Sequence, residues 1–141
     1  MAENPTKEKL NEKYFLYQVL TQNLENLKQQ LELVEQQLIE LKATSASLSD
    51  LSKINESNEI FMPLGSGCFG VGKITDGKKI LLNAGAGVFV SKDIASAKTS
   101  IEENFKEIEK AGLDIEEQMK KTVGQINEVA ADIQEMASAA R

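Results

Sequence analysis

Glycines in the middle of the chain have a spacing that could bind phosphate. Gly65–Gly70 matches the spacing of a dinucleotide-binding fingerprint, and Gly67–Lys73 matches most of a phosphate-binding loop. That loop needs a serine or threonine directly after its lysine to hold magnesium, but Ile74 takes this place. The turn residues Asp76 and Gly77 follow, so the helix whose N-terminus would hold the phosphate cannot form there. We therefore interpret these glycines as turn and strand residues and expect no cofactor.

Residues that usually carry out hydrolytic catalysis are missing as well. The 141 residues include no histidine and a single cysteine, Cys68. Without histidine, neither a zinc site of the usual kind nor a Ser/His or Cys/His nucleophilic pair can be built, and one cysteine cannot form an internal disulfide. We interpret Cys68 as a small strand residue. The sequence predicts a protein with no catalytic residues and no metal site, which is not an enzyme.

The charge and hydropathy of the chain narrow the class of partner. The formal net charge is −6 and the lysines and arginines form no basic stripe, which argues against nucleic acid. No apolar run approaches the roughly 20 residues that cross a bilayer, and the N-terminus does not have the basic stretch and apolar core of a signal peptide. We expect a soluble, cytoplasmic protein with no membrane partner.

The placement of glycine divides the chain into three segments. No glycine precedes Gly65, whereas seven lie from Gly65 to Gly87. Such a distribution is typical of two helical segments around a turn-rich one. We therefore predict an N-terminal coiled-coil helix in 1–57, an oligomerisation segment in 58–91 and a C-terminal coiled-coil helix in 92–141.

Both outer segments repeat apolar residues in steps of three and four, the pattern of a coiled coil with heptad positions a to g. In the first segment, positions a and d are Leu10, Tyr17, Leu20, Leu24, Leu27, Leu31, Val34, Leu38, Leu41 and Leu48, with Lys13 and Ser45 as exceptions. In the last segment, they are Ile94, Ile101, Phe105, Ile108, Ile115, Met119, Ile126, Val129, Ile133, Met136 and Ala140, with Lys98, Gly112 and Thr122 as exceptions. Two helices of similar length bury such seams by folding back on each other. The sequence therefore predicts a mainly α protein built on a long antiparallel coiled-coil hairpin.

The middle segment is predicted to form four short strands. They span Glu59–Leu64, Cys68–Ile74, Lys79–Asn83 and Gly87–Ser91. Thr75–Lys78 is a hairpin signal because Asp and Gly tolerate positive φ, and Ser91, with Asp93 close behind, is the predicted start of the last helix. Strands this short bury too little surface alone and leave open edges, so we expect two β-hairpins that join an oligomeric β-barrel with other subunits. The predicted oligomerisation residues are Ile60, Met62, Leu64, Phe69, Val71, Ile80, Leu82, Val88 and Val90.

These middle residues resemble those of prefoldin. Glu59–Gly65, which ends in a Pro-Leu-Gly turn, looks like the family's first strand, and Asn83–Val90 looks like its last glycine-punctuated hairpin before the second helix. The likeness extends over essentially the whole chain and is to the alpha-type subunit, which has two hairpins where the beta-type has one. It implies a hexamer of two alpha-type and four beta-type subunits, with a double β-barrel platform and six coiled-coil arms. It also implies that unfolded client proteins bind at the arm tips and pass to a group II chaperonin without nucleotide hydrolysis.

One apolar cluster lies off the seam, near the predicted tip. Tyr14, Phe15 and Leu16 make the helix apolar all round, which indicates a widened core, a contact with a neighbouring arm, or a surface that grips clients. The predicted client-binding residues are Leu10, Tyr14, Phe15, Leu16, Ile133, Met136, Ala137 and Ala140. For Gly112 we consider two hypotheses, namely that it softens the arm or that it accommodates a close neighbour.

Two other functions stay open from the sequence alone. A coiled-coil scaffold or adaptor with one fixed partner would have the same heptads, and the off-seam cluster at Tyr14–Leu16 is what favours a chaperone subunit. A nucleotide-dependent enzyme would be indicated by nucleotide binding that disappears in Lys73→Ala. We predict an ATP-independent chaperone subunit that holds unfolded proteins.

Overall fold

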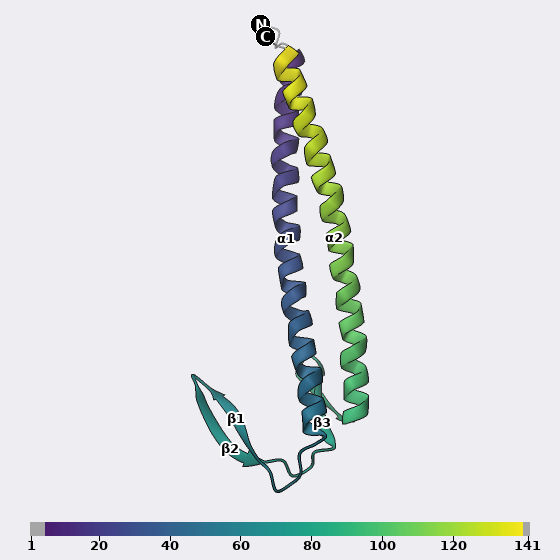
Figure 1. Cartoon of the computed structure of the whole chain (residues 1–141). Helices are drawn as coiled ribbons and strands as arrows, with labels where there is room; N and C mark the ends of the chain where they lie inside the picture. The colour runs from purple at the N-terminus through teal and green to yellow at the C-terminus, as the bar shows by residue number, and fades with distance from the viewer. Residues whose placement is uncertain (1–4, 140–141) are drawn as a thin grey trace. The chain divides into compact units, whose positions relative to one another are not determined.

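The chain forms two long helices, which are separated in the sequence by four strands (Figure 1). The structure is a computed structural model, and it describes residues 5–139. In chain order the elements are α1 (Pro5–Leu51), β1 (Glu59–Gly65), β2 (Cys68–Lys73), β3 (Lys79–Gly85), β4 (Val88–Asp93) and α2 (Ile94–Ala139). This order confirms the predicted mainly α architecture with two β-hairpins in the connector. Among the described residues, no helix combines the length and apolar character that crossing a membrane requires.

Two compact units make up the chain. Residues 1–37 and 108–141 form one, which we call the helical unit, and residues 38–107 form the other, which we call the mixed unit. Each unit contains part of α1 and part of α2, and the mixed unit also contains all four strands.

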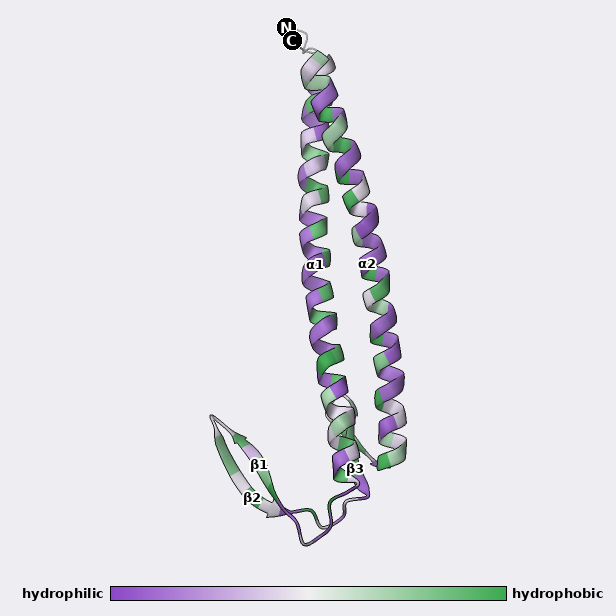
Figure 2. Ribbon diagram, in the orientation of Figure 1, coloured by the Kyte–Doolittle hydropathy of each residue, from purple (hydrophilic) through white to green (hydrophobic). Residues whose placement is uncertain are grey.

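In the helical unit, α1 and α2 lie antiparallel and meet along the predicted seam. Lys13 contacts Asp132 and Val34 lies beside Gly112, so residues early in α1 meet residues late in α2. The described a and d residues of this unit are buried or half-buried, with Tyr17 as the exception. In Figure 2, hydrophobic residues recur along both helices between stretches of hydrophilic ones. A pair of amphipathic helices buries one stripe of each helix in this way and leaves the rest to solvent.

Gly112 allows a close approach between the helices of the helical unit. A Cβ atom at this position would lie 3.1 Å from Cγ1 of Val34, which is tighter than an ordinary van der Waals contact. At Gly124, by contrast, a Cβ atom would meet nothing within 4 Å. The neighbouring Val34 therefore accounts for a glycine at a seam position, while the proposed softening of the arm stays a prediction.

Replacing Gly112 or Gly124 with alanine is expected to change the free energy of unfolding by different amounts. Alanine is favoured over glycine inside a helix by roughly 1 kcal/mol, so Gly124→Ala should raise the free energy of unfolding by up to about that amount. Gly112→Ala should raise it less, because Val34 must move to admit the new methyl group. Urea unfolding followed by circular dichroism measures both changes. A larger gain for Gly112→Ala than for Gly124→Ala would contradict the close packing at Val34.

The core of the mixed unit lies where the two helices meet the second hairpin. Leu48 of α1 is buried with Ala97 and Ile101 of α2, and no part of Ala97 is exposed (0%). Ile80 and Leu82 of β3 pack against this cluster. Because side chains of a strand alternate between its two faces, one face of β3 is thereby committed to the core of its own chain.

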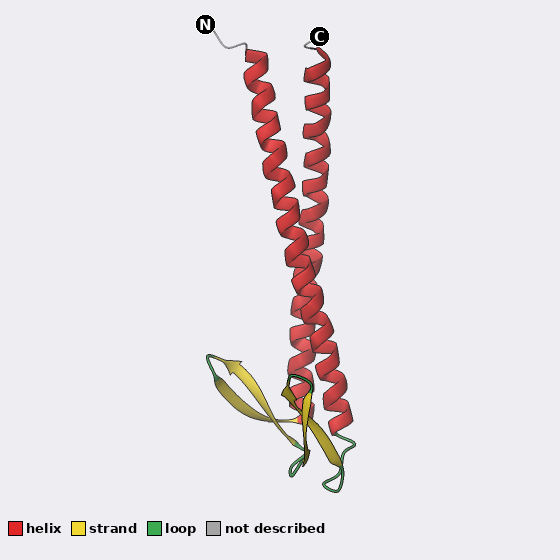
Figure 3. Cartoon of the chain, turned by 90° about the vertical axis from the view of Figure 1, so that its left-hand side faces the viewer, coloured by secondary structure: helices red, strands yellow, loops and turns green. Residues whose placement is uncertain are grey.

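The two hairpins repeat one pattern. β1 pairs with β2 and β3 pairs with β4, both antiparallel, as two separate two-stranded sheets (Figure 3). Their registers are equivalent, with Glu59 opposite Lys73 in the first hairpin and Lys79 opposite Asp93 in the second. Identical residues occupy equivalent positions in the pairs Ile60 and Ile80, Gly65 and Gly85, Gly67 and Gly87, and Phe69 and Phe89. The connector is therefore an internal repeat of one hairpin.

Each hairpin turns at a Gly-x-Gly sequence. Ser66 and Gly67 have φ values of 52° and 77°, and Ala86 and Gly87 have φ values of 50° and 75°. Two successive residues with positive φ form the tight turn whose twist matches that of antiparallel strands. Glycine at the second position adopts this conformation without strain, which is why the turns fall here.

The prediction of a hairpin at Thr75–Lys78 is wrong. This segment joins β2 to β3, and those two strands do not pair. Asp76 accepts a hydrogen bond from the amide of Lys78 at 3.1 Å, so the local turn that its side chain favours does form. Asp76 and Gly77 thus correctly predict a turn, but they do not indicate which strands pair.

The cap of α2 is Asp93, whereas the sequence suggested Ser91. Ser91 lies within β4, while Oδ1 of Asp93 accepts a hydrogen bond from the amide of Ser96 at 2.7 Å. Hydrogen bonds from the backbone and the side chain of Ser96 lower the pKa of the Asp93 carboxyl group. Because this pKa is lower in the folded state, the cap stabilises the fold above the unfolded-state pKa. That contribution is lost as the pH falls through the folded-state pKa.

Candidate functional site

One face of each hairpin is apolar and exposed. Alternate strand residues share a face, and the register places the residues opposite them on the same face. We call this the outer face, and its large apolar members are Phe61, Phe69, Val71, Leu81 and Phe89. Each of them is at least 60% exposed. A two-stranded sheet is marginally stable alone, and exposed apolar surface of this kind commonly serves as an interaction surface.

On the opposite face of the first hairpin, the side chain of Met62 lies over the glycines of β2. Met62 lies across from Gly70, and a Cβ atom at Gly72 would come within 2.8 Å of Cε of Met62. The glycines of β2 therefore make room for Met62. In the second hairpin the equivalent residue is Leu82, which packs on the helical core instead. No residue of the first hairpin is buried within the described chain.

The structure divides the predicted oligomerisation residues into two groups. Six are exposed and available to another chain, namely Met62, Leu64, Phe69, Val71, Val88 and Val90. Ile60 is half-buried, and Ile80 and Leu82 pack on the core of their own chain. Sequence reasoning missed Phe61, Leu81 and Phe89 of the outer face. The strict alternation of strand side chains could have found them once the register was known.

The first residues of α1 carry a second exposed apolar surface. Tyr14, Phe15, Leu16 and Tyr17 follow one another, and we call them the terminal cluster. Phe15 is 68% exposed, and the other three are between 38% and 48% exposed. Four consecutive residues surround a helix, so this cluster presents apolar groups beyond the seam that α2 covers.

The other predicted client-binding residues lie closer to the seam. Leu10, Ile133 and Met136 are half-buried, and Ala137 is exposed. Ala140 lies outside the described residues. Met136 lines a shallow hollow together with charged residues of both helices, among them Lys13 and Asp132. The structure thus brings Met136 near α1 and leaves the terminal cluster as the main apolar surface of this region.

An ion pair occupies one of the seam positions that interrupt the apolar pattern. Nζ of Lys13 lies 2.8 Å from Oδ2 of Asp132, and both side chains are partly exposed. The lysine fills a d position, and its partner comes from the neighbouring helix. A charge at a seam position costs stability unless it is paired, and the pair also fixes which residues of the two helices meet.

The coupling between Lys13 and Asp132 is expected to be small and sensitive to salt. Because both side chains are more than one third exposed, a double-mutant cycle with Lys13→Ala and Asp132→Ala should give about 0.2–1 kcal/mol. The coupling should fall towards zero in 1 M salt, where screening acts over roughly 3 Å. Thermal unfolding of the four proteins at low and high salt measures it. A coupling that salt leaves unchanged would contradict a solvent-screened pair.

The glycines that match a phosphate-binding loop lie in a hairpin, which does not provide the helix that such a loop needs. Gly67 is in the turn between β1 and β2, and Gly70 and Gly72 are within β2, which is followed by a strand and not by a helix. Cys68 begins β2 and is exposed. Among residues 5–139, no three aspartate, glutamate or cysteine side chains group together as metal ligands would. The predicted turn and strand roles of these glycines are confirmed.

Comparison with known proteins gives one consistent result. The model of the prefoldin family, described as "Prefoldin subunit", matches residues 20–139. The chain is 29% identical to the prefoldin subunit alpha of Methanococcus aeolicus, over 94% of this chain and 90% of that protein. It is 32% identical to the prefoldin subunit alpha of Pyrococcus horikoshii, over 100% of this chain and 90% of that protein.

A solved structure shares the fold. The cryo-EM structure of filamentous PFD from Methanocaldococcus jannaschii superimposes with a TM-score of 0.73 at 20% sequence identity. The likeness covers 86% of this chain and 98% of that one. Two long helices around strand hairpins are therefore an arrangement that a solved structure also contains.

Proposed function

Because this chain belongs to the prefoldin family, we propose that it is the alpha-type subunit of a chaperone that holds unfolded proteins without ATP. The complex would contain two alpha-type and four beta-type subunits and act in the cytoplasm. The exposed apolar outer face of the hairpins carries this proposal, because a lone chain that displayed it would associate with other chains.

Assembly through the hairpins follows from their incomplete packing. Two-stranded sheets have free edges, and the first hairpin has no buried residue within the described chain. Strands from neighbouring subunits would cover the outer face and pair with the open edges, and closing a barrel removes edges altogether. The second hairpin, anchored by Ile80 and Leu82, would hold this joint to the helices.

Client binding is assigned to the terminal cluster. Unfolded proteins expose apolar side chains, and Tyr14, Phe15, Leu16 and Tyr17 offer exposed apolar and aromatic surface to them. One such patch binds weakly, but several arms in one complex raise the effective concentration of sites. No bond is made or broken in this mechanism, so it needs no nucleotide. The bound client would then pass to a group II chaperonin.

Replacing three residues of the terminal cluster should remove most of the holding activity while leaving the complex intact. The test variant is Tyr14→Ser/Phe15→Ser/Leu16→Ser, and the matched control is Leu33→Ser/Leu113→Ser/Val123→Ser, which also removes three exposed apolar residues from helices of the helical unit. Light scattering follows the aggregation of an unfolding model protein, without nucleotide, in the presence of each chain and a beta-type subunit. We expect the test variant to lose most of the suppression and the control to keep it.

Suppression that survives in the test variant would contradict client binding at the terminal cluster. Wild-type complexes that leave aggregation undiminished would contradict the holding function itself. A scaffold with one fixed partner would give that second result, since its surface would recognise one folded protein only.

A further inference from the structure

The two flanks of the helix pair differ over residues 23–37 and 109–125 of the helical unit. Positions g and e lie on either side of a heptad seam, and g residues of antiparallel helices share one flank. On the g flank the facing residues are Asn23, Gln30 and Gln37 of α1 and Ala111, Gln118 and Gln125 of α2. On the e flank they include Lys28 and Glu35 of α1 and Glu109 and Glu116 of α2. One flank is thus charged, as coiled coils usually are, and the other is rich in carboxamides and has no charge over this stretch.

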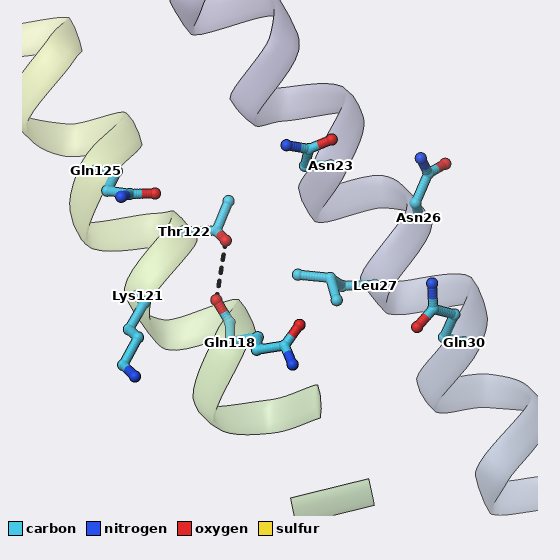
Figure 4. A pocket seen from close by; sticks show the side chains of 8 residues that line it. All are labelled: Asn23, Asn26, Leu27, Gln30, Gln118, Lys121, Thr122 and Gln125. Atoms are coloured by element: carbon cyan, nitrogen blue, oxygen red, sulfur yellow. Dashed lines mark hydrogen bonds between the residues drawn. The ribbon is translucent and has the colours of Figure 1, made fainter. Parts of the chain in front are cut away.

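The carboxamides surround a hollow. Asn23, Gln30, Gln118 and Gln125 line a space of about 420 Å³ between the helices, together with Asn26, Leu27, Lys121 and Thr122 (Figure 4). Leu27 points from α1 towards Thr122, and the Thr122 hydroxyl donates a hydrogen bond to the carbonyl oxygen of Gln118 at 2.9 Å (Figure 4). The donor of that hydroxyl is therefore used within α2, and the hollow combines the apolar side chain of Leu27 with polar groups around it.

Polar groups on the rim are left unpaired by the chain itself. Within residues 5–139, the side chains of Asn23, Gln30, Gln118 and Gln125 make no hydrogen bond, while Asn26 accepts one from Gln22 at 3.3 Å. The one charge at the rim, Lys121, lies 3.4 Å from Glu117 on its own helix. The hollow therefore offers donors and acceptors together, with no unbalanced charge.

Such a rim is suited to a peptide backbone. A carboxamide carries two donors and a carbonyl acceptor, the same groups as a peptide unit, and can bond to an N–H or a C=O. A helix offers no such groups along its length because its own bonds use them, whereas an extended segment presents both unpaired. The four carboxamides carry no charge, so they do not discriminate between charged side chains. These properties select an extended polypeptide as the occupant over another helix.

We propose that this carboxamide flank is a further client contact, which binds extended segments through their backbone. It rests on the proposed function and deepens it. The terminal cluster would select apolar side chains, and the carboxamide flank would hold the connecting chain whatever its sequence. A holding chaperone that serves many clients benefits from such a site because every unfolded chain has the same backbone.

The test compares alanine variants of the two flanks in the full-length chain. The flank variant is Asn23→Ala/Gln30→Ala/Gln118→Ala/Gln125→Ala, and the control is Lys28→Ala/Glu35→Ala/Glu109→Ala/Glu116→Ala on the charged flank. Alanine is the best helix former, so both variants should keep the helices, which circular dichroism checks. The probes are a short, uncharged, fluorescently labelled peptide and the same peptide with N-methylated amides, and fluorescence anisotropy gives their affinities.

We expect the flank variant to bind the peptide about tenfold more weakly than the wild type, the effect of losing one or two net hydrogen bonds. The control should bind as the wild type does, and the wild type should bind the N-methylated peptide about as weakly as the flank variant binds the parent peptide. Equal affinities of wild type and flank variant, or of both peptides, would overturn the proposal. If wild-type complexes still suppress aggregation in that case, only this inference fails and the holding function stands.

Discussion

Replacing both Phe61 and Phe69 with serine should leave the chain unable to assemble with other subunits. Both rings belong to the outer face, where Phe61 is 73% and Phe69 is 62% exposed, so the substitutions remove apolar surface without opening a hole in the core. An aromatic residue at the centre of an interface commonly contributes about 2 kcal/mol or more of binding free energy. Losing two of them should therefore weaken association by about a thousandfold or more. Size-exclusion chromatography with light scattering measures the mass of the complex at micromolar concentration.

Ile39→Ser/Leu113→Ser is the matched control for this variant. These two side chains are 68% and 60% exposed and lie on the helices, away from the strands in sequence. The control should assemble as the wild type does. A Phe61→Ser/Phe69→Ser chain that forms the same complex as the wild type would show that subunits meet somewhere other than the outer face.

Alanine at Ile101 should be the most destabilising single change in the mixed unit. Ile101 is 7% exposed and packs with Leu48 and Ala97, and these residues support Ile80 and Leu82 of β3. Truncating a buried isoleucine to alanine typically costs about 2–5 kcal/mol, partly from lost burial and partly from the cavity that remains. Urea unfolding of the isolated chain measures the change. Assembly should weaken too, because the second hairpin loses its support.

Ile39→Ala provides the comparison for the core substitution. Its side chain is 68% exposed, so truncation should change the free energy of unfolding by less than about 0.5 kcal/mol. If Ile101→Ala and Ile39→Ala are equally mild, the cluster of Leu48, Ala97 and Ile101 does not hold the mixed unit together.

The helices could be predicted from the sequence because the contacts of a coiled coil recur with the heptad repeat of apolar residues. Apart from Tyr17, the described heptad positions are buried or half-buried, and these include Gly112 and Thr122, which interrupt the apolar pattern. Lys13 shows the limit of this reasoning. Its partner Asp132 lies on the other helix, and no spacing within either helix indicates that the two meet.

The hairpins could be predicted less completely because strand pairing depends on register. The predicted strands agree with the observed ones to within two residues at each end. The sequence also predicts a hairpin turn at Thr75–Lys78, whereas the tight turns lie at Ser66-Gly67 and Ala86-Gly87. Without the register, the faces of the strands could not be separated. The apolar residues that cover the chain's own core therefore could not be told from Phe61, Leu81 and Phe89 of the outer face.

The candidate sites show the same division. The terminal cluster was visible in the sequence because four consecutive apolar or aromatic residues cannot all fit one seam. The carboxamide flank was not, since single asparagines and glutamines at helix surfaces are ordinary. It becomes distinct only when Asn23 and Gln30 of α1 are seen to share a hollow with Gln118 and Gln125 of α2.

Native mass spectrometry can be applied to this chain mixed with a beta-type subunit and an unfolded client, without nucleotide. We expect a species with the mass of two copies of this chain, four beta-type subunits and a bound client. A chain that stays monomeric in this mixture, or a complex that carries no client, would contradict this prediction.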